Sequence, residues 1–275
     1  MFQDFEDQFD LPKKTKKHWE KKKKRDDAQA DPSVWVKESL EDEGVVVARV
    51  IGLSLPNIEL LGNEEIFSAI LDPKVSAHWA KDLVIGDVVF IRSNDGQRFI
   101  LARRPRTSSI IRMRGDRTRS VLEQHVLAAN VDVGVIVAAL ANPEFHPRFI
   151  DRYLAVLQDG NVTPLICLTK ADLTDERHPV LRSYRAMGIP VIETSRDAEE
   201  GLEELKRYIR GKMAVFVGQS GVGKSTLVNL LTPHAQAETG EVTERRGTGK
   251  HTTTRSNLYE WEGDSFIIDT PGIRS

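Results

Sequence analysis

Two patterns of apolar and polar residues divide the chain. Between residues 44 and 104, short runs rich in β-branched residues are separated by turn sequences, and Asp95-Gly96 is a strong hairpin signal. These runs predict strands at 44–55, 57–62, 64–71, 87–93 and 97–104. Five short strands in about 60 residues are typical of a small barrel. The OB-fold is the leading candidate, although other small barrels fit the same pattern.

From residue 122 the pattern changes to strands and helices in alternation, which predicts an α/β domain. Residues 131–140 are apolar almost throughout, as in a strand that is covered on both faces. The elements predicted after it are a helix at 146–160, a strand within 163–173, a helix at 176–187, a strand at 189–195, a helix at 198–211, a strand at 212–218, a helix from 224 and a hairpin at 257–272. We expect the arginine-rich stretch 103–119 to be a linker.

The chain is therefore predicted to have three parts: a disordered basic tail (1–35), an OB-fold domain (36–107) and an α/β domain (108–275). Residues 13–25 contain nine lysines and arginines and one glutamate, although the whole chain has a net charge of −2. Such a run cannot fold by itself, because its charges repel and it has few apolar groups to bury. It is either a solvated tail or an arm that neutralises the phosphates of a nucleic acid. A membrane-surface role has less support, because neither a lipidation motif nor an amphipathic pattern accompanies the run.

The composition, 40% hydrophobic and 29% charged residues, is that of a globular protein with a sizeable core. No apolar run reaches the length of a membrane span, and the acidic N-terminus does not resemble a signal peptide. Cys167 is the one cysteine, which excludes a disulfide within the chain. It lies in an apolar, strand-like run and is interpreted as a core residue. A reducing cytoplasm fits these features.

The clearest functional motif is the phosphate-binding loop, G-x-x-x-x-G-K-[ST], between a predicted strand and a predicted helix. Its backbone N–H groups are expected to hold the phosphates of a nucleotide. Lys224 is expected to bridge the β- and γ-phosphates as the catalytic cation, and Ser225 to bind Mg²⁺. The nucleotide contacts predicted in this loop are Gly218, Gln219, Ser220, Gly221, Val222, Gly223, Lys224, Ser225 and Thr226.

A second motif lies upstream of this loop. The stretch Leu-Thr-Lys-Ala-Asp-Leu at 168–173 is similar to the Asn-Lys-x-Asp motif by which GTPases select guanine. The carboxylate of Asp172 can accept hydrogen bonds from the ring N–H and the exocyclic amine of guanine, groups that adenine lacks. The base contacts predicted here are Thr169, which stands in place of asparagine, Lys170, Ala171 and Asp172. Thr194 and Ser195 follow the next strand, where a second base-binding loop is expected.

The remaining motifs lie downstream. Asp269 and Gly272 form an Asp-x-x-Gly motif after an apolar strand, with Asp269 predicted to hold Mg²⁺ and Gly272 to contact the γ-phosphate. Thr253 lies where a switch threonine that binds Mg²⁺ belongs. Many GTPases place a water-orienting glutamine after this glycine, but here the position is Ile273. His251 is a tentative catalytic alternative, and a group supplied by a partner is another.

The order of the motifs is unusual. A conventional GTPase begins with the phosphate loop and ends with the two base-binding motifs, whereas here the two base-binding motifs come first. A circular permutation explains this order, and it is tolerated because chain termini tend to lie close together at the surface. The predicted fold class is thus a circularly permuted α/β P-loop GTPase domain, preceded by a small all-β OB-fold barrel.

The combination of motifs resembles the RsgA (YjeQ) family of circularly permuted GTPases over residues 40–275. The resemblance rests on the barrel and on the segments AANVD (128–132), IDRYL (150–154), GQSGVGKST, GKHTTT and DTPGIRS. It implies a GTP hydrolase that uses Mg²⁺, binds the small ribosomal subunit and its ribosomal RNA, acts in late assembly of that subunit and is stimulated by it. We expect a cytoplasmic monomer without a membrane partner.

The same resemblance implies a C-terminal zinc-binding domain, whose cysteine and histidine ligands would lie beyond residue 275. Cys167 cannot replace them, because a structural zinc ion takes four ligands. We therefore expect a shortened chain without a zinc site.

Two other functions stay open: an RNA-binding protein with a decayed nucleotide domain, and a P-loop enzyme acting on an adenine nucleotide. The intact phosphate loop and Asp172 argue against decay, whereas Thr169 and Ile273 argue for it. Lys170 and Asp172 argue against an adenine nucleotide, because an ATPase has no use for this pair at a strand end.

Overall fold

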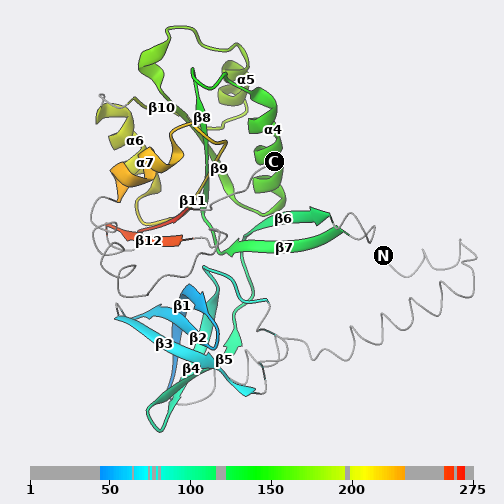
Figure 1. Cartoon of the computed structure of the whole chain (residues 1–275), viewed down its shortest axis with the longest axis vertical. Coiled ribbons are helices and arrows are strands. Elements are labelled where there is room, and N and C mark those ends of the chain that lie inside the picture. The colour runs from blue at the N-terminus through cyan, green and yellow to red at the C-terminus, as the bar shows by residue number, and fades with distance from the viewer. Residues whose placement is uncertain are drawn as a thin grey trace, which may run out of the picture.

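The computed structural model describes residues 44–63, 65–73, 75, 79, 82–115, 122–195, 199–232, 257–262 and 265–269. A closed barrel and a six-stranded sheet lie one below the other, with a two-stranded ribbon beside the sheet (Figure 1). The predicted basic tail lies outside the described residues. No helix in the described part is long and apolar enough to span a membrane.

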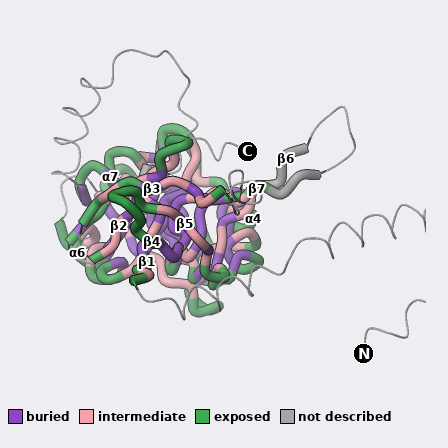
Figure 2. Tube along the Cα trace, turned by 90° about the horizontal axis from the view of Figure 1, so that it is seen from below, coloured by how far each residue is buried: buried purple, intermediate pink, exposed green. Residues whose placement is uncertain are grey.

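The barrel confirms the predicted small all-β domain of OB type. Its strands are β1 (Val45–Ser54), β2 (Asn57–Gly62), β3 (Glu65–Leu71), β4 (Val88–Asn94) and β5 (Gln97–Arg103), closed in the order β1-β2-β3-β5-β4. All neighbours pair antiparallel except β3 and β5. Asp95 and Gly96 join β4 to β5 with positive φ angles of 49° and 79°, as a two-residue hairpin turn requires. Figure 2 shows the buried residues enclosed by exposed ones.

The six-stranded sheet has the order β10-β9-β8-β11-β13-β12. Its strands are β8 (Val133–Ala139), β9 (Thr163–Thr169), β10 (Val191–Glu193), β11 (Met213–Gly218), β12 (Asn257–Trp261) and β13 (Ser265–Asp269). The pairs are parallel except β12 with β13. The strand that carries the phosphate loop, β11, is therefore central although it is the fourth of the six along the chain.

Four helices cover the two faces of this sheet. On one face, α4 (Pro147–Asp159) and α5 (Val180–Ala186) pack against side chains such as Ile136 and Ile166. On the other face, α6 (Glu199–Ile209) and α7 (Lys224–Leu231) pack against side chains such as Val135 and Phe216. Every residue of β8 is consequently buried, which explains its continuous apolar sequence.

Two predicted elements differ from the structure. The linker expected at 103–119 is wrong, because β6 (Ser109–Gly115) pairs with β7 (Leu122–Ala129) in an antiparallel ribbon. Ile110 anchors this ribbon in the core of the sheet domain, a long-range contact that the local arginine content hides. The helix expected from residue 176 begins at Val180, because a residue before proline, here His178, avoids the helical conformation. The boundaries of the three predicted parts stay predictions.

The barrel meets the amino ends of β11 and β13. Arg49 of β1 donates a hydrogen bond to Met213 Sδ (3.7 Å), and its guanidinium lies 5.6 Å from the centre of the Phe266 ring. Burial lowers the pKa of Arg49, and the carboxylate of Asp132 partly offsets this effect. A backbone hydrogen bond also connects the barrel side to the other domain, because the Ala129 N–H donates to the Ile85 carbonyl (2.9 Å). We call this contact region, around Arg49, Ala129, Met213 and Phe266, the joint.

Candidate functional site

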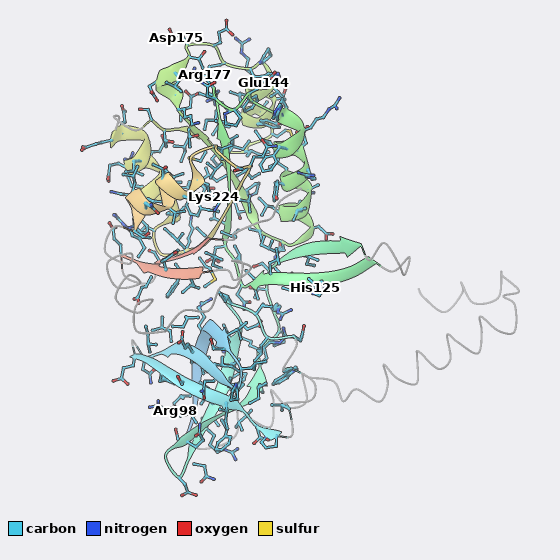
Figure 3. The ribbon with its side chains drawn as sticks, viewed as in Figure 1. Arg98, His125, Glu144, Asp175, Arg177 and Lys224 are labelled. Atoms are coloured by element: carbon cyan, nitrogen blue, oxygen red, sulfur yellow. The ribbon has the colours of Figure 1, made fainter. Side chains whose placement is uncertain are left out.

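The parallel strands of the sheet end at a common edge, the position at which open α/β sheets bind ligands. The pairing of β11 with β8 on one side and β13 on the other brings the loops after these strands together. Figure 3 places Lys224 beside β11, at the start of α7. The edge is thus where the predicted nucleotide contacts that lie within the described residues converge.

The phosphate loop runs from Gly218, the last residue of β11, to Lys224, the first residue of α7. Gly221 and Gly223 have φ angles of 79° and 90°, which strain any residue with a side chain. A Cβ atom on Gly218 would lie 2.9 Å from the Val137 carbonyl oxygen. No acidic residue occupies the first turn of α7, so its N-terminal N–H groups favour an anion.

The side chains of this loop differ in exposure. Val222 is buried and packs beneath the loop, whereas Lys224 and Gln219 are half-buried. Ser220, Ser225 and Thr226 are exposed. The hydroxyl of Ser225, in the first helical turn beside the loop, is the kind of hard oxygen ligand that Mg²⁺ prefers.

Thr169, the residue in place of asparagine, connects the predicted base-binding segment (residues 168–173) to the phosphate loop. It is the last residue of β9 and is 7% exposed. Its hydroxyl donates a hydrogen bond of 2.5 Å to the carbonyl oxygen of Val222. In this structure Thr169 therefore positions the loop, and a hydroxyl is sufficient for that contact.

Lys170 makes a second connection to the same loop. Its backbone is left-handed (φ 57°), and its ammonium group donates to the carbonyl oxygens of Gly221 (2.9 Å) and Asn142. The backbone then forms a short 3₁₀ helix, Ala171–Leu173, on which Asp172 is exposed. The carboxylate is thus available to a ligand at the sheet edge.

The loop after β10 lies against the base-binding segment. The Thr194 carbonyl accepts a hydrogen bond from the Ala171 N–H (3.2 Å), and the Thr194 N–H donates to Leu168 (2.6 Å). The Thr194 side chain is buried against Cys167, with 3.8 Å between Sγ and Oγ1. Ser195 follows and is half-buried. Of this pair, Thr194 contributes its backbone to the site.

A charged cluster that the sequence did not reveal supports these loops. Glu193, at the end of β10, forms ion pairs with Arg177 (2.8 Å) and Arg185 (3.3 Å). Arg177 also donates to the Thr174 carbonyl (2.6 Å), immediately after the 3₁₀ helix. No local signal marks these partners, because they are brought together by the packing of α5 beside β10.

The downstream predictions are only partly within the described residues. Asp269 ends β13, and its backbone pairs with Phe216 of β11, two residues before the phosphate loop begins. Its side chain lies outside the description, as do His251, Thr253, Gly272 and Ile273. In the described part, no group of three or more histidine, cysteine, aspartate or glutamate side chains could hold a metal ion.

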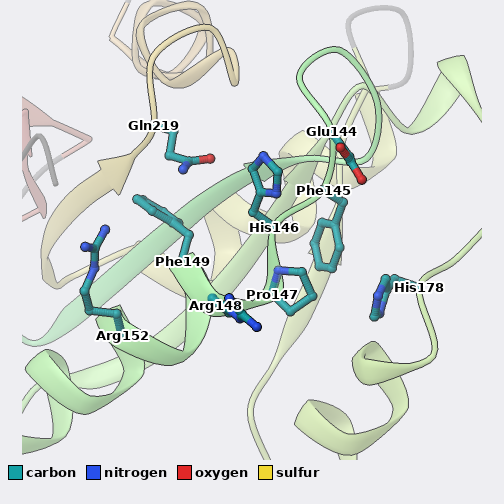
Figure 4. Close-up of a pocket in the computed structure, with 9 residues that line it drawn as sticks. All are labelled: Glu144, Phe145, His146, Pro147, Arg148, Phe149, Arg152, His178 and Gln219. Atoms are coloured by element: carbon teal, nitrogen blue, oxygen red, sulfur yellow. The ribbon is translucent and has the colours of Figure 1, made fainter.

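A depression of about 740 Å³ lies next to the phosphate loop, over the start of α4 (Figure 4). Residues 144–149, Arg152, His178 and Gln219 line it. Gln219 belongs to the phosphate loop, so the depression and the predicted nucleotide site share a wall. None of its other lining residues was predicted as a site residue.

Comparison with known proteins identifies related chains. A family model described as RsgA GTPase matches residues 103–275. A protein of Ectopseudomonas mendocina, named small ribosomal subunit biogenesis GTPase RsgA, is 44% identical over 200 residues, or 70% of this chain. A protein of the same name from Pseudomonas fluorescens is 43% identical over 198 residues. The chain spans 56% of the length of each of these two relatives.

Two solved structures share the fold. The crystal structure of YjeQ from Thermotoga maritima matches with a TM-score of 0.61 and 25% identity, over 83% of this chain and 75% of that one. The structure of YloQ, described as a circularly permuted GTPase, matches with a TM-score of 0.61 and 23% identity, over 86% of this chain and 74% of that one. These matches confirm the predicted fold class.

Proposed function

Because the chain belongs to the RsgA GTPase family, we propose that it hydrolyses GTP to GDP and phosphate and acts in late assembly of the small ribosomal subunit. The observation that carries the proposal is the contact of the base-binding segment with the phosphate loop. Thr169 and Lys170 both bind carbonyl oxygens of that loop, at Val222 and Gly221. A base selected by Asp172 is thereby placed at a set distance from its phosphates.

The residues have distinct roles in this proposal. The N–H groups of the phosphate loop and of the first turn of α7 hold the phosphates, and Lys224 neutralises charge that develops during transfer. Mg²⁺, bound with the nucleotide, supplies further charge neutralisation at the phosphates. Its proposed protein ligands are Ser225, Thr253 and Asp269. Thr226 contacts the α-phosphate, and Gly272 contacts the γ-phosphate.

The water that attacks the γ-phosphate needs an orienting group. Ile273 cannot supply one, because its side chain has no polar atom. His251 is one candidate, and a group on the small ribosomal subunit is the other. If the subunit supplies the orienting group, GTP turnover is slow without the subunit and faster with it. We adopt this subunit-dependent form of the proposal.

The proposed partners are the small ribosomal subunit and its ribosomal RNA. The names of the relatives state, for those proteins, a role in biogenesis of the small ribosomal subunit. An OB barrel commonly binds single strands through charge and stacking. We propose a cytoplasmic monomer. Zinc has no proposed site in this chain.

The first experiment measures GTP turnover by the chain alone and with purified small ribosomal subunits. Stimulation supports both the enzyme and its partner. Turnover that is equal with and without subunits contradicts the ribosome-dependent form, provided that subunit binding is shown in the same sample. Competition between GTP and ATP for binding tests the adenine alternative, which predicts equal or better binding of ATP.

A further inference from the structure

The depression beside the phosphate loop carries a concentration of positive charge. Arg148 and Arg152 lie on α4, four residues apart, so both side chains extend from one face of the helix. His146 and His178 also line the depression. Glu144 is the one carboxylate in the lining. The surface therefore favours an anionic ligand.

The two arginines have no carboxylate partner among the described residues, whereas other arginines of the chain do. Arg177 and Arg210 each form an ion pair of 2.8 Å or shorter. Asp151, which lies between the two arginines in sequence, instead accepts a hydrogen bond of 2.6 Å from the Tyr184 hydroxyl on α5. Arg148 and Arg152 are both exposed, so their guanidinium groups are accessible to an anionic ligand.

Aromatic rings accompany these charges. Phe145 is half-buried, and its ring centre lies 5.4 Å from that of His178 with an angle of 42° between the planes. The Arg152 guanidinium lies 5.8 Å from the centre of the Phe149 ring, but that ring is only 6% exposed, so Phe145 is the phenylalanine of the lining that can contact a base. Basic groups that bind a backbone, together with rings on which bases stack, are the chemistry of sites for single-stranded nucleic acid. An acidic peptide would also satisfy the charges, but the Phe145–His178 pair beside them favours a ligand that carries planar bases.

We propose that this depression binds a single-stranded segment of RNA, with Arg148 and Arg152 on neighbouring phosphates and the Phe145–His178 pair against a base. This proposal rests on the proposed ribosomal function. It assigns a surface of the α/β domain to contact with RNA. Its lining contains no residue of the barrel, and Gln219 is the one predicted nucleotide contact in it.

The position of the site implies a coupling to the nucleotide. Gln219, the second residue of the phosphate loop, faces His146 and Phe149 across the depression (Figure 4). RNA in the depression would touch the loop that holds the phosphates. If the loop differs between GTP- and GDP-bound forms, RNA affinity and nucleotide affinity must change each other by the same factor.

The test compares a double variant, Arg148→Ala with Arg152→Ala, against a matched control, Arg182→Ala with Arg207→Ala. The control removes the same charge from exposed positions on α5 and α6. Binding of fluorescein-labelled oligouridylate is measured over a range of salt concentrations. Each lost phosphate contact lowers the salt slope by about 0.7 for a single strand, so the double variant should lose about 1.4 and the control nothing.

A second measurement locates the RNA directly. Photo-crosslinking of RNA that contains 4-thiouridine, followed by mass spectrometry, should identify peptides that include residues 144–152. Equal salt slopes in the double variant and the control, or crosslinks confined to other peptides, would overturn the site. Polyglutamate that displaces the RNA and binds as tightly would also overturn it, in favour of an acidic protein partner.

GTP binding and turnover are measured for all forms in the same experiment. We expect them to be unchanged in the double variant without RNA, because neither arginine belongs to the proposed nucleotide contacts. Failure of the unaltered chain to bind GTP contradicts the proposed function. Normal GTP turnover, with RNA binding that ignores Arg148 and Arg152, contradicts only this site.

Discussion

At the carboxyl ends of β9 and β11 the loops are joined by hydrogen bonds from the Thr169 and Lys170 side chains to carbonyl oxygens of the phosphate loop, whereas at the amino ends of β11 and β13 the barrel covers the sheet. The first end leaves Lys224 and Asp172 accessible to a ligand. The second end buries Arg49 against Met213 and Phe266. One short strand, β11, begins in the joint and ends in the phosphate loop.

The two ends of β11 therefore contribute to different properties of the protein: one end to ligand binding and the other to stability. Changes to Lys224 or Asp172 at the carboxyl end should alter ligand binding and turnover with little effect on stability, because Asp172 is exposed and Lys224 is half-buried. Changes at the joint should alter stability with little effect on nucleotide affinity. Variants at both ends of the strand test that separation.

The largest effect is expected from Lys224→Ala. Removing the cation proposed to stabilise the phosphates should reduce GTP turnover by about 100-fold or more. Lys212→Ala is the matched control, because Lys212 precedes the same strand at its other end and binds the Tyr208 carbonyl (2.7 Å). Steady-state release of phosphate measures both variants. Turnover near that of the unaltered protein in Lys224→Ala contradicts the proposed role.

Gly86→Ala should have the next largest effect, on stability. Gly86 has a φ of 90°, and a Cβ atom there would lie 2.0 Å from the Ala129 carbonyl oxygen in the joint. We expect a loss of about 2–4 kcal/mol in the free energy of unfolding. Gly211→Ala is the control, because Gly211 also has a positive φ, of 70°, but a Cβ atom would meet nothing within 4 Å.

For Gly211→Ala we expect the backbone strain alone, about 1–2 kcal/mol. Denaturant titration measures both variants, and nucleotide affinity is measured on the folded proteins. A nucleotide affinity that falls strongly in Gly86→Ala would break the comparison, since it would show that the joint controls the carboxyl end through β11.

Asp172→Asn should weaken binding of GTP by about 10- to 100-fold, because it removes the charge from hydrogen bonds that typically contribute about 1.5–3 kcal/mol. The weak affinity for ATP should stay unchanged, since adenine cannot donate the same hydrogen bonds. Competition titrations with both nucleotides measure the effect. An equal loss for GTP and ATP would mean that Asp172 supports the loop and does not read the base.

The smallest effect is expected at Cys167, in the middle of the sheet. Burial raises the pKa of its thiol from 9.0 to about 12, and the Thr194 hydroxyl partly offsets this effect. The thiol should therefore resist alkylation at pH 8 in the folded protein and react on unfolding. Rapid modification of the folded protein by iodoacetamide would contradict the buried position.

The same shift has a consequence for stability. A raised pKa in the folded state means that the contribution of the protonated thiol is fully present below pH 9.0 and is lost as the pH rises towards 12. A Cys167→Ala variant should lack this alkaline component of the unfolding curve.

The strands of the barrel could be predicted closely because their signals are local. The segment 57–62 is predicted and observed with the same limits, and the Asp95-Gly96 turn lies where its sequence indicates. The ribbon of β6 and β7, by contrast, was not predicted, because β6 lies within the arginine-rich stretch 103–119. Its pairing depends on the contact of Ile110 with the core of the sheet domain, which no local window contains.

In the candidate site too, some features could be predicted from the sequence and others could not. The phosphate loop and Asp172 are recognisable because their motifs fix residue types within a short span. The hydrogen bond from Thr169 to Val222 joins residues 53 positions apart, and the ion pair of Arg177 with Glu193 requires α5 to pack beside β10. Thr169 could be identified as a candidate from the sequence, but the partners in these two contacts could not.

Local signals in the sequence were sufficient for the class of each domain, for the permuted order of the motifs and for the proposal of which residues bind a nucleotide, because periodicity and turn chemistry act over a few residues. Only the tertiary structure decided what those residues touch. The covered amino end, the threonine that holds the phosphate loop and the depression over α4 all arise where segments distant in the chain meet. Packing and hydrogen bonding between them depend on three-dimensional proximity, for which the chain carries no local mark.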